Sequence, residues 1–207
     1  MNEMKNILLA GLVFITLLGN PPESLSLSQR GKLRGIKADK GWFLSIYGGQ
    51  VNEDSLENTL TLNANYVNSY FCAFTAGKKL ANYRGNIDIE AEGQIVKHWG
   101  IQDHFEFNAL FILRWLSFPW DEYLDTSFAV GDGISYATKY PEIEVEKKHP
   151  VSQKILNYLM FELAFVVPKK PNWSVFIRLH HRSAMFGLIG GEDGGSNAAG
   201  IGFRYTF

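Results

Sequence analysis

Apolar and polar residues alternate strictly in several stretches of this chain, each about ten residues long. In 86–95, for example, every odd position carries Ile, Ala or Gly, and every even position carries a polar or charged residue. A period of two is typical of a β-strand with one apolar and one polar face. Eight such stretches, some clearer than others, predict eight strands: 42–51, 66–78, 86–95, 104–115, 126–136, 155–167, 173–183 and 199–207.

Two architectures use this alternation, and they differ in what covers the apolar face. A soluble β-sandwich buries it in a core, whereas a membrane barrel turns it to lipid and points its polar face inward. The strands are long enough for a tilted bilayer crossing, and the chain ends in Phe207 after Tyr205 and Phe203 at alternate positions. That ending resembles the C-terminal signature of bacterial outer-membrane barrels. The sequence therefore predicts an all-β, eight-stranded antiparallel up-and-down transmembrane β-barrel, with a periplasmic lipid-binding barrel as a weaker alternative.

The connections between the predicted strands agree with this topology. If both termini lie in the periplasm, the outer loops are 52–64, 96–103, 137–152 and 184–196, and the inner turns are 79–85, 116–125 and 168–172. The outer loops are on the whole longer, as expected for this class. An eight-stranded barrel is filled by side chains, so we expect its inward charged residues to pair with one another rather than line a channel. These residues are Asp88, Glu90, Glu92, Glu106, Arg114, Arg178 and Arg204.

The N-terminal segment has the layout of a secretory signal peptide. Lys5 precedes a short apolar run at 7–18, and two prolines and a Ser-rich stretch follow it. The run is short for a transmembrane helix, which favours a cleaved leader over an N-terminal anchor or a buried helix. We expect residues 1–28 to be the signal peptide and residues 29–207 to form the barrel domain. The chain has no other long apolar run, which excludes a helical membrane protein.

Composition narrows the chemistry. The chain has 20 basic and 21 acidic residues and a net charge of −1, which argues against nucleic-acid binding. Its single cysteine, Cys72, excludes an internal disulfide and a multi-cysteine zinc site. His98, His104 and His149 fall in or near predicted loops, at spacings that suggest no metal site. These patterns therefore predict no metal site.

One hairpin near the C-terminus collects residue types suited to nucleophilic catalysis. His181 and Ser183 lie two apart on a strand, so their side chains project from the same face, which is the apolar face that contains Ile177. Asn197, on the next strand, also has the lipid-facing parity. Polar residues on a lipid-facing stripe are costly unless they have a function or lie at the interface. A His that accepts a serine proton while a third polar group orients it is the arrangement used in acyl transfer.

This C-terminal stretch of about thirty residues resembles the lipid A 3-O-deacylases, a family of outer-membrane barrels, and the broader acyloxyacyl hydrolase-like proteins. In that family a His-x-Ser pair supplies base and nucleophile, an acid on the final strand orients the His, and the terminus is aromatic. His181-Arg182-Ser183 and Phe207 match this pattern. The resemblance implies a serine esterase that hydrolyses an ester-linked acyl chain of lipid A in lipopolysaccharide without a metal or cofactor. His181, Ser183 and Asn197 are then the candidate catalytic residues.

The chain departs from the family pattern at two positions. Asn197 stands where the family has its acid, and an Asn can hold a His by hydrogen bonding. Glu192 and Asp193, in the preceding Gly-rich loop, are alternative carboxylates. Ala184 stands where the family tends to have an oxyanion-hole Asn, so the backbone amides of Ala184 and Met185 are the candidates for that role.

The competing hypothesis is a non-catalytic small outer-membrane barrel that acts in adhesion or envelope integrity. In that case His181 and Ser183 are rim residues that touch lipid headgroups. His180 has the opposite parity and is predicted to be an interior partner of an acid. Three basic residues are weaker candidates for contacting a lipid A phosphate: Arg182, Lys147 and Lys148.

Overall fold

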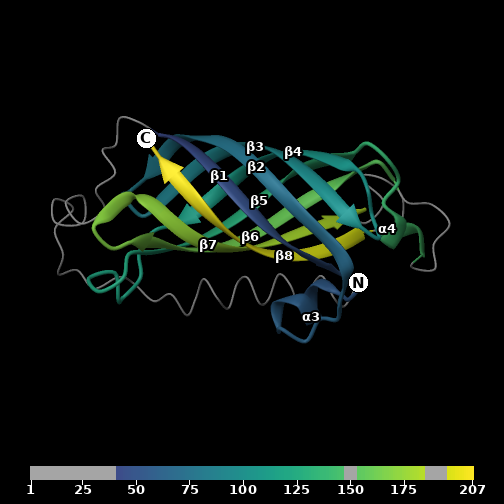
Figure 1. Cartoon of the computed structure of the whole chain (residues 1–207). Coiled ribbons are helices and arrows are strands. Elements are labelled where there is room, and N and C mark those ends of the chain that lie inside the picture. Colours follow the sequence, from purple (N-terminus) through teal and green to yellow (C-terminus); the bar gives the residue numbers. More distant parts are fainter. Residues whose placement is uncertain (1–40, 147–152, 185–194) are drawn as a thin grey trace.

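The computed structural model describes residues 41–146, 153–184 and 195–207. In this part of the chain eight antiparallel strands form one closed barrel (Figure 1). Each strand pairs with the next one along the chain, and β8 pairs with β1. The strands are β1 (Trp42–Asn52), β2 (Tyr66–Tyr83), β3 (Ile87–Gly100), β4 (Phe105–Trp115), β5 (Thr126–Ala137), β6 (Ile155–Val167), β7 (Lys170–Ser183) and β8 (Gly195–Thr206). The predicted all-β up-and-down barrel is confirmed, and the predicted signal peptide at 1–28 lies outside the described residues.

Two short helices lie near the end of the barrel at which β1, β3, β5 and β7 finish, called the long-loop end below (Figure 1). α3 (Leu56–Leu60) follows β1 and lies outside the barrel wall. α4 (Glu142–Glu146) follows β5 and buries Ile143 in an apolar cluster with Tyr47, Phe71 and Phe176 inside the barrel. Among the described residues, no helix is long and apolar enough to cross a membrane.

Several strands are longer than the alternation predicted, and β2 and β3 gain the most residues. β2 continues past 78 to Tyr83, and β3 continues past 95 to Gly100. β2 and β3 stay hydrogen-bonded to each other where the alternation of apolar and polar residues stops. This is because the register of their pairing shifts between Lys79 and Ala81 of β2. The connection between β3 and β4 is therefore 101–104 rather than the predicted 96–103.

The turn between β2 and β3 is tight. Arg84 and Gly85 have φ angles of 51° and 75°, and the amide of Asn86 donates to the carbonyl of Tyr83 at 3.1 Å. Positive φ at both central residues is the mark of a type I′ turn, whose twist matches that of the strands it joins. The predicted inner turn at 79–85 thus shrinks to 84–86.

The outer face of the barrel is apolar around its middle and aromatic near both ends. The exposed apolar belt consists of Ile46, Phe74, Ile95, Phe111, Ile134, Ile177 and Ile201. Exposed aromatic residues flank it at the two ends: Trp42, Tyr83, Trp173 and Phe207 at one, and Tyr66, Tyr70, Trp99 and Tyr136 at the other. An exposed apolar surface of this extent marks contact with lipid or a partner, and a belt between aromatic girdles is typical of an outer-membrane barrel.

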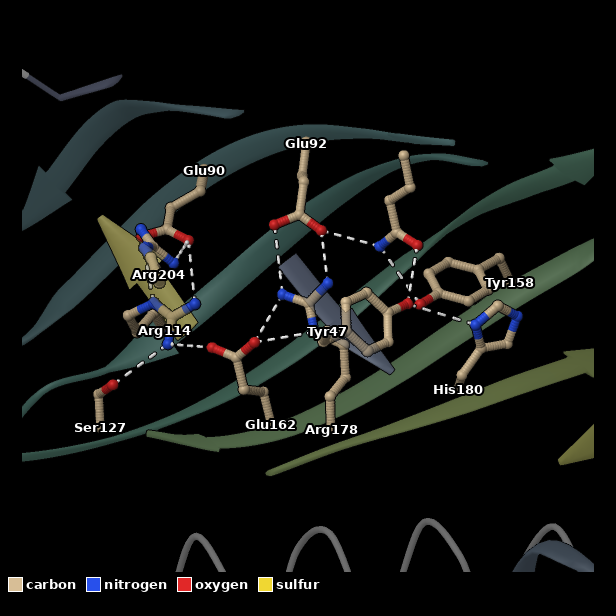
Figure 2. Close-up of polar contacts among 11 residues, drawn as sticks. Tyr47, Glu90, Glu92, Arg114, Ser127, Tyr158, Glu162, Arg178, His180 and Arg204 are labelled. Atoms are coloured by element: carbon tan, nitrogen blue, oxygen red, sulfur yellow. Dashed lines mark hydrogen bonds and ion pairs between the residues drawn. The ribbon is translucent and has the colours of Figure 1, made fainter. Parts of the chain in front are cut away.

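The polar face of the strands points into the barrel, where arginines and glutamates alternate in one network (Figure 2). Arg178 stands at its centre and is fully buried. Its guanidinium lies 2.6 Å from Glu92 Oε1 and 2.5 Å from Glu162 Oε2. The alternative barrel with its apolar face turned inward is therefore wrong, because the interior holds the charged parity.

From Arg178 the network continues toward the end of the barrel opposite the long-loop end. Arg114 lies 2.8 Å from Glu162 Oε1 and 3.1 Å from Glu90 Oε1, and Arg204 lies 2.7 Å from Glu90 Oε1. Three arginines thus face three glutamates, so the charges within this network balance. The predicted mutual pairing of inward charges is confirmed, and it joins strands β3, β4, β6, β7 and β8 across the barrel.

Candidate active site

The β7–β8 hairpin places His181, Ser183 and Asn197 at the long-loop end. His181 is directly opposite Asn197 in the ladder, and Ser183 is opposite Gly195. All three share the parity of the exposed residue Ile177, so their side chains belong to the outer face of the wall. The structure therefore brings His181 and Asn197 into contact and sets Ser183 on the same face of β7.

A chain of two hydrogen bonds orients the His181 ring. His181 Nδ1 lies 2.6 Å from Asn197 Oδ1, and Asn197 Nδ2 donates to the backbone carbonyl of Asp54 at 2.6 Å. A carbonyl oxygen only accepts, so the amide nitrogen of Asn197 must face Asp54 and its oxygen must face the ring. His181 Nδ1 then carries the proton, and Nε2 is the basic nitrogen.

The segment after β1 holds the Asp54 carbonyl in place. The side chain of Asn52 is buried, and its Oδ1 accepts from the amide of Asp54 at 3.2 Å and from Thr59 Oγ1 at 3.1 Å. Ser55 caps α3 by accepting from the amide of Asn58 at 3.2 Å. As a result this segment covers Asn197, which is only 4 % exposed although it sits on the outer face.

Sequence reasoning missed Asp54 because a backbone carbonyl has no residue signature. The one sequence feature that points to this segment is the pair Asn52 and Asp54, which forms an Asx turn directly after β1. β1 also closes the barrel by pairing with β8. Asn52 pairs with Asn197 in that ladder. A topology with β1 beside β8 therefore brings the turn to the candidate site.

Ser183 lies half-buried two positions beyond His181. Strands rise about 3.3 Å per residue, so the two Cα atoms are about 6.6 Å apart on one face. Ala184, the next residue, is buried. Met185, Glu192 and Asp193, which the sequence offered for the oxyanion hole and as alternative acids, lie outside the described residues.

The inner side of the same strand is polar and buried. His180 Nε2 lies 2.9 Å from Glu106 Oε1. His180 Nδ1 lies 3.4 Å from the Tyr47 hydroxyl (Figure 2). The prediction of His180 as an interior partner of an acid is confirmed. Arg182 is also buried, with its Nη1 3.5 Å from Glu144 Oε1. The hypothesis that Arg182 reaches a lipid phosphate is wrong because its guanidinium is enclosed, and Lys147 and Lys148 lie outside the described residues.

A second cluster lies at the long-loop end inside the barrel. His98, His104 and Glu106 each offer one ligand atom, and these atoms all lie within 4.8 Å of one another. Burial lowers the pKa of His104 to about 3, and the adjacent His98 adds to the effect, so the ring is neutral. The spacing of these histidines in the sequence suggested no metal site, whereas the structure brings His98 and His104 beside Glu106, because β3 extends to Gly100 and residues 98, 104 and 106 share the same inward parity. His149 lies outside the described residues.

The closed barrel, its apolar belt and its charged interior define this chain as an eight-stranded barrel of the outer-membrane class. Among solved structures it is similar to the outer-membrane enzyme PagL, with a TM-score of 0.53 and 10% identity over 80% of this chain and 99% of that one. Neisserial surface protein A gives a TM-score of 0.47 and 10% identity over 81% of this chain and 97% of that one. Ail, the attachment invasion locus protein of Yersinia pestis, gives a TM-score of 0.42 and 13% identity over 81% of this chain and 99% of that one.

These likenesses concern the fold, because the identities are far too low to carry more. No protein-family model matches the sequence, and no curated protein matches it. PagL is an outer-membrane enzyme, and the architecture of this chain, with its apolar belt between aromatic girdles, is consistent with the bacterial outer membrane.

Proposed function

We propose that this protein is an outer-membrane serine esterase that removes an ester-linked acyl chain from lipid A of lipopolysaccharide. Ser183 is the nucleophile, His181 the general base and Asn197 the residue that positions His181. The observation that carries the proposal is the chain from His181 Nδ1 through Asn197 to the Asp54 carbonyl on the outer face. A barrel wall does not need a histidine held in one tautomer beside a serine, whereas acyl transfer does.

Each atom has a role in this reaction. His181 Nε2 accepts the proton of Ser183 Oγ as Oγ attacks the acyl carbonyl carbon. The tetrahedral intermediate collapses and breaks the bond to the alcohol oxygen of the ester, which takes the proton from His181 Nε2 and leaves as a hydroxyl, while the acyl group stays on Ser183. The same nitrogen then takes a proton from a water molecule that attacks the acyl-enzyme carbonyl, and it returns that proton to Ser183 Oγ as the fatty acid leaves.

The position of the pair supports a lipid substrate. His181 and Ser183 lie on the outer face near the long-loop end, above the exposed belt residue Ile177 on the same strand. With this end at the cell exterior, the pair meets the outer leaflet, where the acyl esters of lipopolysaccharide reside. The fold of this chain is also that of the outer-membrane enzyme PagL.

Mass spectrometry of lipid A tests the proposal directly. Cells that express the wild-type chain are expected to contain lipid A that lacks one acyl chain, and cells that express Ser183→Ala are expected to contain unmodified lipid A. Ser174→Ala is the matched control, because Ser174 lies on the same strand near its other end and on the opposite face. Unmodified lipid A with a correctly assembled wild-type barrel would contradict the proposal and favour the non-catalytic barrel.

Asn197 gives a second, sharper prediction. Asn197→Leu removes the acceptor for His181 Nδ1 and is expected to lower kcat by up to about 10⁴-fold, the effect of disabling the orienting residue of a triad. Asn197→Asp is expected to be less active than wild type, because its carboxylate oxygen would face the Asp54 carbonyl at the 2.6 Å now spanned by a donor. Single-turnover deacylation of lipopolysaccharide by purified variants measures both effects.

Asn63→Leu makes the same chemical change on an exposed loop and serves as the control for Asn197→Leu. An Asn197→Asp variant more active than the wild type would show that the Asp54 carbonyl does not position the amide. Wild-type rates for Asn197→Leu would remove Asn197 from the mechanism.

A further inference from the structure

The β3–β4 hairpin brings three potential metal ligands together inside the barrel. The backbone amide of His98 donates to the carbonyl of His104 at 3.0 Å, so the hairpin itself sets the two histidines beside each other. Glu106 follows on β4 with the same inward parity, and its Oε2 lies 3.0 Å from His98 Nε2. The three ligand atoms lie within 4.8 Å of one another.

His104 is the unusual member of this cluster. The residue is only 2 % exposed, yet within the described part of the chain neither of its ring nitrogens has a hydrogen-bond partner. His98 Nδ1 is also buried and has no hydrogen-bond partner among the described residues. Buried polar atoms without partners are rare in native proteins because nothing offsets their desolvation. A cation bound at the cluster would use such a nitrogen as a ligand.

The surroundings of Glu106 suit a metal-binding carboxylate. Its Oε1 accepts from the Ser135 hydroxyl at 2.8 Å and lies 2.9 Å from His180 Nε2, while Oε2 faces His98. Outer contacts of this kind fix the orientation of a ligating carboxylate. Arg182 Nη1 lies 3.9 Å from Glu106 Oε2 and 3.5 Å from Glu144 Oε1. Two carboxylates thus surround one guanidinium, and these three groups together carry a net negative charge.

We propose that His98, His104 and Glu106 bind a zinc ion at the long-loop end of the barrel interior. Two imidazole nitrogens, one carboxylate oxygen and a water complete the four-coordinate set that Zn²⁺ prefers, with bonds of about 2.0–2.2 Å. The His98 and His104 rings are stacked, 4.5 Å apart and 12° from parallel. An imidazole binds a metal in its own plane, so the His104 ring rotates about its Cβ–Cγ bond on binding. The rotation breaks no hydrogen bond with the described residues, because the ring makes none.

This site is separate from the proposed esterase. His180 and His181 are adjacent on β7, but His180 points inward to Glu106 while His181 points outward to Asn197. The zinc ion ties the end of β3 to the start of β4 and holds Glu106, the carboxylate that His180 contacts. Its role is structural support of the long-loop end, and it takes no part in acyl transfer.

Zinc titration of the metal-depleted, tag-free barrel in detergent tests the proposal. Isothermal titration calorimetry is expected to show one high-affinity site per chain, and metal analysis after gel filtration is expected to recover one zinc ion per chain. His104→Ala is expected to weaken binding by more than about 100-fold, since loss of a direct ligand exceeds the effect of losing an outer-shell contact. His104 has no hydrogen-bond partner to lose, so this variant is expected to fold, which heat modifiability on gels checks.

His181→Ala is the matched control, because it removes a histidine from the outer face at the same end of the barrel. It is expected to bind zinc as the wild type does, and Co²⁺ in the wild type is expected to give the visible absorption of a tetrahedral site. A folded wild-type barrel that binds no zinc overturns the proposal. So does a His104→Ala variant that binds as tightly as wild type, or a His181→Ala variant that loses the ion.

Discussion

Ser183→Ala and His181→Ala are each expected to lower the rate of lipid A deacylation by about 10⁴-fold or more, and the double variant to lower it no further. The two side chains act as one unit: without the base the hydroxyl is not deprotonated, and without the nucleophile the base has no proton to accept. Removing the second member of such a unit therefore costs little. Single-turnover rates on purified lipopolysaccharide measure all three variants under the same conditions.

The non-additivity separates catalysis from a role at the barrel rim. If both residues merely contacted lipid headgroups, their effects on binding would be small and would add, as for independent sites. The assignment of Ser183 and His181 as nucleophile and base would be contradicted if the double variant lost the product of the two single rate losses. A single variant whose deacylation rate is within tenfold of the wild-type rate would contradict it as well. Each variant must first migrate as a folded barrel, so that lost activity is not lost structure.

Arg178→Met is expected to lower the free energy of unfolding by about 3–5 kcal/mol, the cost of breaking a buried ion pair from one side. Arg178 is fully buried between Glu92 and Glu162, and its removal leaves two glutamates with one fewer positive charge between them. Urea unfolding in detergent or lipid, followed by heat modifiability on gels, measures the change.

A compensating substitution shows that charge rather than shape is responsible. Glu92→Gln in the Arg178→Met background restores the balance, since two arginines then face two glutamates in the network. We expect it to recover a substantial part of the lost stability, because well-packed neutral groups can replace a buried pair at little cost. A loss below about 1 kcal/mol for Arg178→Met, the size seen for exposed pairs, would show that the network is not desolvated.

Much of the fold could be predicted from local pattern. In 104–115 every odd position is apolar, whereas Glu106, Asn108 and Arg114 share the even parity, and the structure gives strand β4 at Phe105–Trp115. The sequence assigned the inward glutamates and arginines correctly. A charged side chain on a membrane-spanning strand cannot face lipid, so it points into the barrel and pairs with an opposite charge there. The same parity set His180 inward and His181 outward, and the structure places them so.

Strand ends were predicted less well. The alternation predicts a strand that ends at 95, yet β3 runs to Gly100, past Lys97, which breaks the apolar parity. Lys97 lies near the end of the barrel, where its chain can reach Asp103 in the loop, and long basic side chains are tolerated at such a depth. The error hid the inward parity of His98, and with it the cluster that His98 forms with His104 and Glu106.

The sequence by itself determined the number of strands, which face of each turns outward, and which hairpin carries the His and the Ser. All of these follow from a period of two, which is a property of each strand alone. Only the tertiary structure decided that Asn197 is held by the carbonyl of Asp54 and that two histidines meet Glu106 in the interior. Those contacts depend on register between strands and on backbone atoms, because hydrogen bonds and metal ligation act over a few ångströms in space and have no period along the chain.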